Sequence, residues 1–279
     1  MKSPLRYPGG KTRACKTLLD IVDREGLDTS EVVSPFTGGA SFEFYLHETR
    51  GTRLILNDKF TPLATFWTTC KHDKDRLCAA LEDAHARGVT KDDFKRMRDA
   101  IMDEPDSLER AKKYFIINRC SFSGSTLSGG FSEESSKKRF TKSSIDRVRA
   151  LKLSDVTIHE DDFASFLNTH GKGTKGFVFV DPPYYLESKS KLYGKNGDLH
   201  ENFDHAGLHE TLERVERDWV LTYNDVPYIR ELYKDHRIID VSWSYGMNSS
   251  KASSEIVILS SPRECTGDAR VHPSCEAIE

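Results

Sequence analysis

The chain has 279 residues, of which 37% are hydrophobic and 30% are charged, and its formal net charge is −3. This length suits one large domain, or a core domain with a smaller insert, and the composition is ordinary for a soluble globular protein. The sequence contains no run of 18 apolar residues and no apolar signal core, so we expect neither a membrane span nor a secretory leader. A net charge near zero does not favour nucleic-acid binding, but it can hide local basic patches.

Six cysteines show neither a CxxC pair nor a histidine spacing typical of zinc sites. We expect them to be reduced thiols in an intracellular protein, cytoplasmic or nucleoid-associated, and inside a host cell if the protein is viral. No metal ion is expected. The cysteines are Cys15, Cys70, Cys78, Cys120, Cys265 and Cys275.

Strand-like and helix-like patterns alternate at both ends of the chain. Helical spacing covers residues 11–23 and 40–47. Short runs rich in β-branched and aromatic residues predict strands at 32–33, 53–56, 156–159, 177–180, 219–223, 237–241 and 256–259. This alternation predicts an α/β protein with a doubly wound, mainly parallel sheet.

The middle of the chain has a different pattern. Residues 66–151 are charged and helix-forming, with a Gly/Ser-rich stretch at 120–136 followed by three basic residues. We therefore expect a core formed by residues 1–65 and 152–260, with residues 66–151 inserted as a helical subdomain that has a loop or hairpin at its tip. Residues 261–279 are polar and lack periodicity, which predicts a loose tail.

The stretch GFVFVDPPYY (residues 176–185) carries the strongest chemical signal. An apolar strand ends abruptly at Asp181-Pro182-Pro183-Tyr184, because proline has no N–H to donate to a sheet. Ligands of open α/β sheets bind at the carboxyl ends of the strands. Asp181 and the Pro182 carbonyl can accept the two hydrogens of an aromatic amine, and Tyr184 can stack on its ring. A plain strand followed by a proline turn is the alternative interpretation.

Two further motifs favour a cofactor that contains a nucleoside. Phe36-Thr37-Gly38-Gly39-Ala40 follows a strand and opens a helix, so its backbone can approach a ligand closely. Asp58 ends the next strand, where an acid commonly binds ribose hydroxyls. The alternatives are a structural turn for the glycines and a helix cap for Asp58.

Two other motifs leave their roles open. Tyr7-Pro8-Gly9-Gly10-Lys11 lacks the spacing of a phosphate loop, but its lysine could meet a carboxylate; a flexible arm is the alternative. The segment 118–124, NRCSFSG, mixes polar and aromatic groups that can contact phosphates and base edges, and a solvated turn is the alternative.

Taken in order, these motifs resemble the D12-class DNA adenine N6-methyltransferases, the Dam family. The resemblance covers roughly residues 2–260 and rests on RYPGGK, PFTGGASFEF, the Asn-Asp pair at 57–58, NRCSFSG, EDDF at 160–163, DPPYY, FDHAGL at 203–208 and LTYND at 221–225. It implies a Rossmann-like methyltransferase core with an inserted target-recognition subdomain. It also implies S-adenosylmethionine as cofactor and adenine in duplex DNA as substrate.

The resemblance also implies roles for individual residues. Tyr7 and Lys11 would lie near the methionine end of the cofactor, and Pro35, Phe36, Gly38 and Gly39 would wrap it. Asp58 would bind the ribose, and Asp162 and Phe163 would hold the cofactor adenine. Asp181, Pro182, Pro183 and Tyr184 would form the catalytic clamp, and Asp181 would also contact the cofactor. The predicted DNA contacts are Lys112, Lys113, Asn118, Arg119, Ser123, Lys137, Lys138 and Arg139.

The predicted reaction transfers a methyl group to the 6-amino group of an adenine that has been flipped out of the base stack. Methylation of cytosine, RNA or a protein glutamine, and a catalytically inactive DNA-binding relative, are the alternatives. Asp181 disfavours the first three, which more often carry Ser or Asn at that position. A monomer is favoured, and a cognate restriction endonuclease is a conceivable partner. The loop PFTGG and the segment after NRCSFSG depart from common relatives, which leaves the target DNA sequence open.

Overall fold

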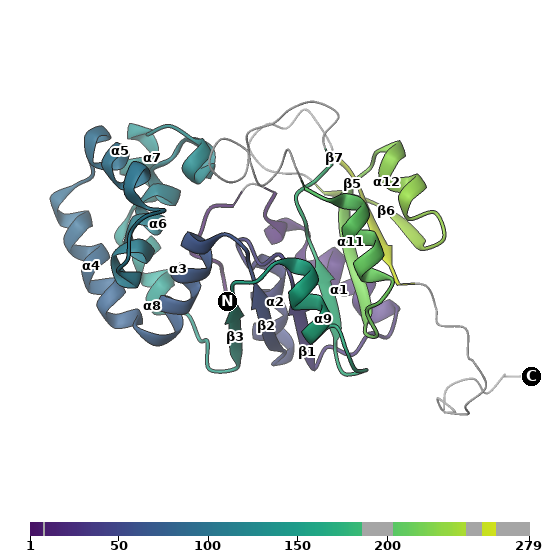
Figure 1. Cartoon of the computed structure of the whole chain (residues 1–279). Coiled ribbons are helices and arrows are strands. Elements are labelled where there is room, and N and C mark those ends of the chain that lie inside the picture. Colours follow the sequence, from purple (N-terminus) through teal and green to yellow (C-terminus); the bar gives the residue numbers. More distant parts are fainter. Residues whose placement is uncertain (8, 186–202, 244–252, 261–279) are drawn as a thin grey trace, which may run out of the picture.

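The computed structural model describes residues 1–7, 9–185, 203–243 and 253–260 (Figure 1). Within them, seven strands form one sheet in the order β3-β2-β1-β4-β5-β7-β6. Strand β7 pairs in the antiparallel direction with both β5 and β6, and the other four pairs of neighbouring strands are parallel. The strands are β1 (Glu31–Ser34), β2 (Arg53–Asn57), β3 (Val156–His159), β4 (Phe177–Val180), β5 (Asp218–Asn224), β6 (Arg237–Trp243) and β7 (Ser253–Leu259). The predicted mainly parallel α/β sheet is confirmed.

Helices cover both faces of this sheet. Alternate residues of a strand point to opposite faces, and in β1 Val32 and Val33 belong to two different hydrophobic clusters. Figure 1 shows α9 and α11 in front of the sheet and α1 behind it. These outer helices, with the 3₁₀ turn η1 that precedes α1, are η1 (Lys11–Arg13), α1 (Cys15–Arg24), α2 (Ser41–Arg50), α9 (Phe163–His170), α11 (His205–Leu212) and α12 (Pro227–Leu232).

A layer of helices lies between β2 and β3 in the chain and beside the sheet in space (Figure 1). The layer comprises α3 (Thr61–His72), α4 (Lys74–Arg87), α5 (Lys91–Ala100), α6 (Ser107–Cys120), α7 (Glu133–Arg139), α8 (Lys142–Arg149) and the 3₁₀ turns Phe122–Gly124 and Thr126–Ser128. The central helix of this layer is α6, whose second half is almost wholly buried. Phe115 of α6 stacks on Phe66 of α3, with 5.7 Å between the ring centroids.

The helical layer shares its core with one face of the sheet. Phe66 and Phe115 belong to the same buried cluster as Leu18 of α1 and Phe42 of α2. The boundary expected at residue 66 lies inside α3, which begins at Thr61. One hydrophobic core therefore extends from this face of the sheet into the helical layer.

Two further expectations concern membranes and cysteines. None of the described helices is long and apolar enough to cross a membrane. Cys15, Cys70, Cys78 and Cys120 are buried free thiols. The two remaining cysteines, and the tail expected at 261–279, lie outside the described residues.

Candidate active site at the carboxyl edge of the sheet

The predicted chemical motifs meet at one edge of the sheet. The glycine loop follows β1, Asp58 follows β2, and Asp181 follows β4. Strand β1 lies between β2 and β4, so the chain leaves the middle of the sheet in both directions. This is a topological switch point, where open α/β sheets bind ligands.

The N-terminal arm packs directly on the glycine loop. A Cβ atom added to Gly38 would lie 2.8 Å from Cε1 of Tyr7, and one added to Gly39 would lie 2.9 Å from Cβ of Tyr7. Gly38 also has a φ of +46°, a conformation that side chains disfavour. The Trp67 indole N–H of α3 donates to the Gly38 carbonyl at 3.1 Å. The backbone conformation therefore favours glycine at position 38, and the close approach of Tyr7 favours glycine at both positions.

Asp58 is tied to the same loop. Its carboxylate accepts the N–H of Gly38 at 2.9 Å and the N–H of Phe60 at 3.0 Å. Burial raises the pKa of Asp58 to about 6, while these two hydrogen bonds oppose the rise. The contact with Phe60 agrees with the capping alternative, and the contact with Gly38 links the acid to the glycine loop.

An aromatic cluster flanks the loop. Phe36 lies 5.6 Å from Phe163 and 5.5 Å from Phe203, measured between ring centroids. Asp162 caps α9 by accepting the N–H of Ala164 and pairs with Lys59. Its position thus orients Phe163, the first residue of α9, toward Phe36.

The amide of Asn57 joins the loops that carry this cluster. It donates to the carbonyls of Pro35 and Asp161 and accepts the N–H of Asp161 at 2.8 Å. Asn57 is buried, so these bonds hold the ends of β1, β2 and β3 together. The sequence resemblance marked the Asn57-Asp58 pair without assigning this role to Asn57.

Asp181 lies in a preformed network. Lys11 donates from Nζ to Oδ1 of Asp181 at 2.7 Å, and the hydroxyl of Thr222 in β5 donates to the same oxygen at 2.7 Å. Lys11 is only 3% exposed, so the ion pair is largely screened from water. The prediction that Lys11 could meet a carboxylate is matched by this contact.

Tyr184 is anchored through its hydroxyl. The hydroxyl donates to Oε2 of Glu255 in β7 at 2.7 Å, while Nζ of Lys11 lies 4.9 Å from the centre of the ring. Glu255 is 1% exposed, and its other oxygen, Oε1, has no hydrogen-bond partner within the described part of the chain. The sequence did not reveal Glu255, because it lies on a late strand 71 residues away.

A comparison with protein families now decides the class of this site. The family described as D12 class N6 adenine-specific DNA methyltransferase matches residues 7–247. The chain belongs to this family. It is an enzyme that methylates the N6 atom of adenine in DNA and uses S-adenosylmethionine. Among curated proteins, none matches the chain.

The residues at this edge of the methyltransferase fit its cofactor. Asp58 offers a carboxylate to hydroxyl donors, and the rings of Phe36 and Phe163 offer flat apolar faces. Glu43 of α2 adds a buried carboxyl group, which accepts the hydroxyl of Ser34 at 2.7 Å. Burial raises the pKa of Glu43 to about 7, and the nearby charge of Asp181 adds to the rise. Glu43 is a second acid that sequence reasoning missed.

Two of the predicted DNA contacts of the methyltransferase are buried. The Asn118 amide holds the backbone of Arg6, accepting its N–H at 2.9 Å and donating to its carbonyl at 2.6 Å. The Arg119 guanidinium donates to the carbonyls of Arg139 and Pro4. Both side chains therefore anchor the N-terminal arm to α6, and their contact with DNA stays a prediction.

The predicted lysine contacts are already paired with acids. Lys112 and Lys113 are mostly buried and pair with Glu109 and Glu104. The other four predicted contacts are exposed: Lys137 and Lys138, which pair with Glu133 and Glu134 one turn away on α7, and Ser123 and Arg139.

A cluster of guanidinium groups lies where the N-terminal arm packs on the helical layer. Burial lowers the pKa of Arg119 to about 10, and the charges of Arg147, Arg6 and Arg139 lower it further. Among the described residues, none of these four arginines forms an ion pair with a carboxylate. Arg6 donates to the Ser121 carbonyl and the Ser135 hydroxyl, which brings it to the other members of this arginine cluster (Arg6, Arg119, Arg139 and Arg147). Sequence reasoning missed Arg6 and Arg147.

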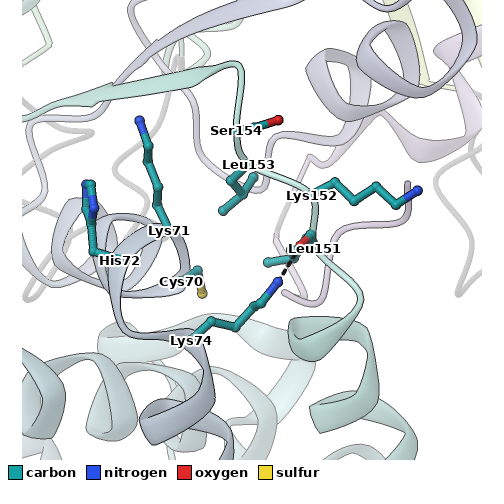
Figure 2. Close-up of a pocket in the computed structure, with 8 residues that line it drawn as sticks. All are labelled: Cys70, Lys71, His72, Lys74, Leu151, Lys152, Leu153 and Ser154. Atoms are coloured by element: carbon teal, nitrogen blue, oxygen red, sulfur yellow. Dashed lines mark hydrogen bonds between the residues drawn. The ribbon is translucent and has the colours of Figure 1, made fainter.

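A pocket elsewhere in the methyltransferase is also lined by lysines (Figure 2). It lies between the end of α3 and the segment that precedes β3, at the amino edge of the sheet. Two of its ammonium groups donate to backbone carbonyls, Lys71 to Val156 at 2.5 Å and Lys74 to Leu151 at 2.7 Å. These lysines hold the start of β3, away from the active site.

Proposed function

We propose that Asp181, Pro182, Pro183 and Tyr184 form the clamp that holds and activates the target adenine. The network of Lys11, Asp181 and Thr222 carries this proposal, because it holds a carboxylate in place beside the glycine loop. Lys11 and Thr222 both donate to Oδ1, so Oδ2 is the oxygen that we assign to one amine hydrogen. The Pro182 carbonyl accepts the other hydrogen.

These two acceptors address the central difficulty of the reaction. The lone pair of the adenine amine is delocalised into the ring, which makes the amine a poor nucleophile. Hydrogen bonds to both amine hydrogens favour a tetrahedral nitrogen with a localised lone pair. Acceptors held in place before the reaction need no rearrangement in the transition state.

The cofactor-binding residues keep the roles that the resemblance implies. Tyr7 and Lys11 lie near the methionine end of the cofactor, and Pro35, Phe36, Gly38 and Gly39 wrap it. Asp58 accepts ribose hydroxyls, and Asp162 and Phe163 hold the adenine of the cofactor. When bound, S-adenosylmethionine supplies an electrophilic methyl group. Phe36, Phe163 and Phe203 supply an apolar wall for a flat ring.

DNA binding is assigned to the face on which the helical layer adjoins the active site. The proposed architecture is a Rossmann-like core, residues 1–65 and 152–260, with residues 66–151 inserted to recognise DNA. The arginine cluster supports this assignment, since guanidinium groups without acid partners suit phosphates. Phe122 is 70% exposed on the turn that adjoins Arg6 and offers a ring to an unstacked base.

The proposal is tested by transfer of a radiolabelled methyl group to duplex DNA, followed by nucleoside analysis. We expect label in N6-methyl-2′-deoxyadenosine only, and we expect it to be lost when adenines at the target are replaced. Labelled cytosine, or label in RNA but not in duplex DNA, would contradict the proposed substrate. Mapping methylated adenines in the DNA of an expressing host identifies the target sequence.

A further inference from the structure

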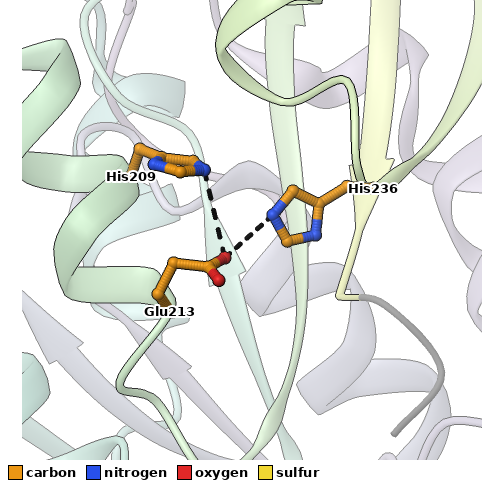
Figure 3. Close-up of side chains that lie close together, drawn as sticks. All are labelled: His209, Glu213 and His236. Carbon is orange, nitrogen blue, oxygen red and sulfur yellow. Dashed lines mark ion pairs between the residues drawn. The ribbon is translucent and has the colours of Figure 1, made fainter. Parts of the chain in front are cut away.

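Three side chains with metal-binding atoms converge at the amino edge of the sheet (Figure 3). His209 and Glu213 lie one turn apart on and just after α11, and His236 immediately precedes β6. Nε2 of His236 is 2.9 Å from Oε1 of Glu213, and Nε2 of His209 is 4.0 Å from the same oxygen. All three ligand atoms lie within 4.8 Å of one another.

This geometry is close to that of a three-ligand zinc site. Zinc binds imidazole nitrogen and carboxylate oxygen at about 2.0–2.2 Å, so tetrahedral ligands lie roughly 3.3–3.6 Å apart. The two measured distances, 2.9 and 4.0 Å, lie on either side of that range. Glu213 is half exposed, so its side chain has room to adjust its position between the two imidazoles.

The surroundings of the three side chains supply two further features of a site. His236 packs against Trp219 at 4.9 Å and against Tyr233 at 5.8 Å, which fixes its ring. The ring of Tyr233 lies 4.9 Å from that of His209; Tyr233 is fully buried, and its hydroxyl has no hydrogen-bond partner among the residues that the structure describes. A buried hydroxyl without a partner is costly, so it favours a further polar group here.

We propose that His209, Glu213 and His236 bind one divalent transition-metal ion, with zinc preferred. Two imidazoles and one carboxylate are ligands suited to zinc. Asp181 contacts Thr222, four residues beyond the start of β5 at Asp218, so about 13 Å of strand separates Asp181 from the amino edge, at about 3.3 Å per residue. The ion therefore ties α11 to β6 and takes no part in methyl transfer. The sequence pattern typical of zinc sites, paired cysteines and histidines, does not include this set, because one of its ligands is the carboxylate of Glu213.

The test uses the full-length enzyme, stripped of metal with a chelator and titrated with zinc alone. We expect one zinc per chain and a zinc-induced rise in melting temperature, because the ion binds the folded state. His209→Ala and Glu213→Gln should weaken zinc binding at least about 10-fold. The matched control is Glu210→Gln, an exposed acid on the same helix that pairs with Arg214 and should leave binding unchanged.

Cobalt then separates this site from the cysteines. With the proposed ligands, the cobalt spectrum has no thiolate charge-transfer band, and its visible bands are lost in Glu213→Gln. The proposal is overturned if the enzyme binds no zinc, if both ligand variants bind zinc as the wild type does, or if a thiolate band accompanies binding. The zinc-induced shift is compared within each variant, so a change in baseline stability does not affect the result.

Discussion

The carboxyl edge of the sheet and the face of the helical layer hold their charges in different ways. At the sheet edge, Lys11, Asp181, Thr222, Tyr184 and Glu255 are joined by short contacts among mostly buried groups. On the helical layer, Lys137 and Lys138 are exposed and each is paired with an acid of the same helix. Buried polar contacts are strong and costly to break, whereas exposed pairs contribute little. We therefore expect substitutions to have large effects at the sheet edge and graded effects on the helical layer.

The largest effect is expected from Asp181→Ala. Removing the acceptor for an amine hydrogen should lower kcat by roughly 100-fold or more, because the missing hydrogen bond acts on the transition state. Binding of S-adenosylmethionine should weaken less than turnover. Single-turnover methylation and calorimetry measure the two effects, with Asp83→Ala on the exposed face of α4 as control. A variant that keeps most of its kcat would exclude the clamp.

Asp58→Ala should have the next largest effect, on cofactor affinity. We expect S-adenosylmethionine binding to weaken by about 1–3 kcal/mol, the cost of removing charge-assisted hydrogen bonds. The pKa of Asp58 is raised to about 6, so the carboxylate that accepts hydroxyl donors is present above that pH. Affinity should accordingly fall as the pH drops through about 6, and Asp58→Asn should abolish that dependence. Unchanged affinity in calorimetry would leave Asp58 as a helix cap alone.

Tyr184 and Glu255 test whether the buried network positions the clamp. Sequence reasoning predicts stacking by the ring of Tyr184, but the structure adds a hydrogen bond from its hydroxyl. Tyr184→Phe should lower kcat by about 10-fold, because it leaves a buried carboxylate without its donor. Adding Glu255→Gln should restore part of that activity, whereas Tyr184→Ala should not be rescued. If the effects of the two single variants simply add in the double variant, Glu255 does not act through Tyr184.

The smallest effects are expected from substitutions on the helical layer. There, the loss of DNA binding should distinguish the arginine cluster from the lysines that are paired with acids. Arg139→Ala and Arg147→Ala should each weaken binding to DNA of any sequence and reduce the salt slope by about 0.9 for each phosphate that is no longer neutralised. Lys137→Ala and Lys138→Ala should change the slope less, because each lysine is already paired with an acid. Fluorescence anisotropy over a range of salt concentrations measures all four. A larger change for the lysines would reverse the proposed assignment.

Local pattern was sufficient to predict most of the fold. Each predicted strand lies within an observed one, because buried runs such as Phe177–Val180 have a composition typical of central parallel strands. The predicted helix over 11–23 is observed as a 3₁₀ turn followed by α1, whose buried Leu18, Ile21 and Val22 follow helical spacing. The antiparallel direction of β7 was not predicted, since a strand's own sequence does not determine its partner.

By itself, the sequence determined the family and the chemical motifs at the strand ends, because these depend on neighbouring residues and on their order. The tertiary structure decided which distant groups meet. Glu255 accepts the hydroxyl of Tyr184, and Arg6 joins the arginines of the helical layer. Asn118 and Arg119 point inward and hold the N-terminal arm. Contacts between residues more than 70 positions apart depend on strand order and helix packing, and no local spacing in the chain records them.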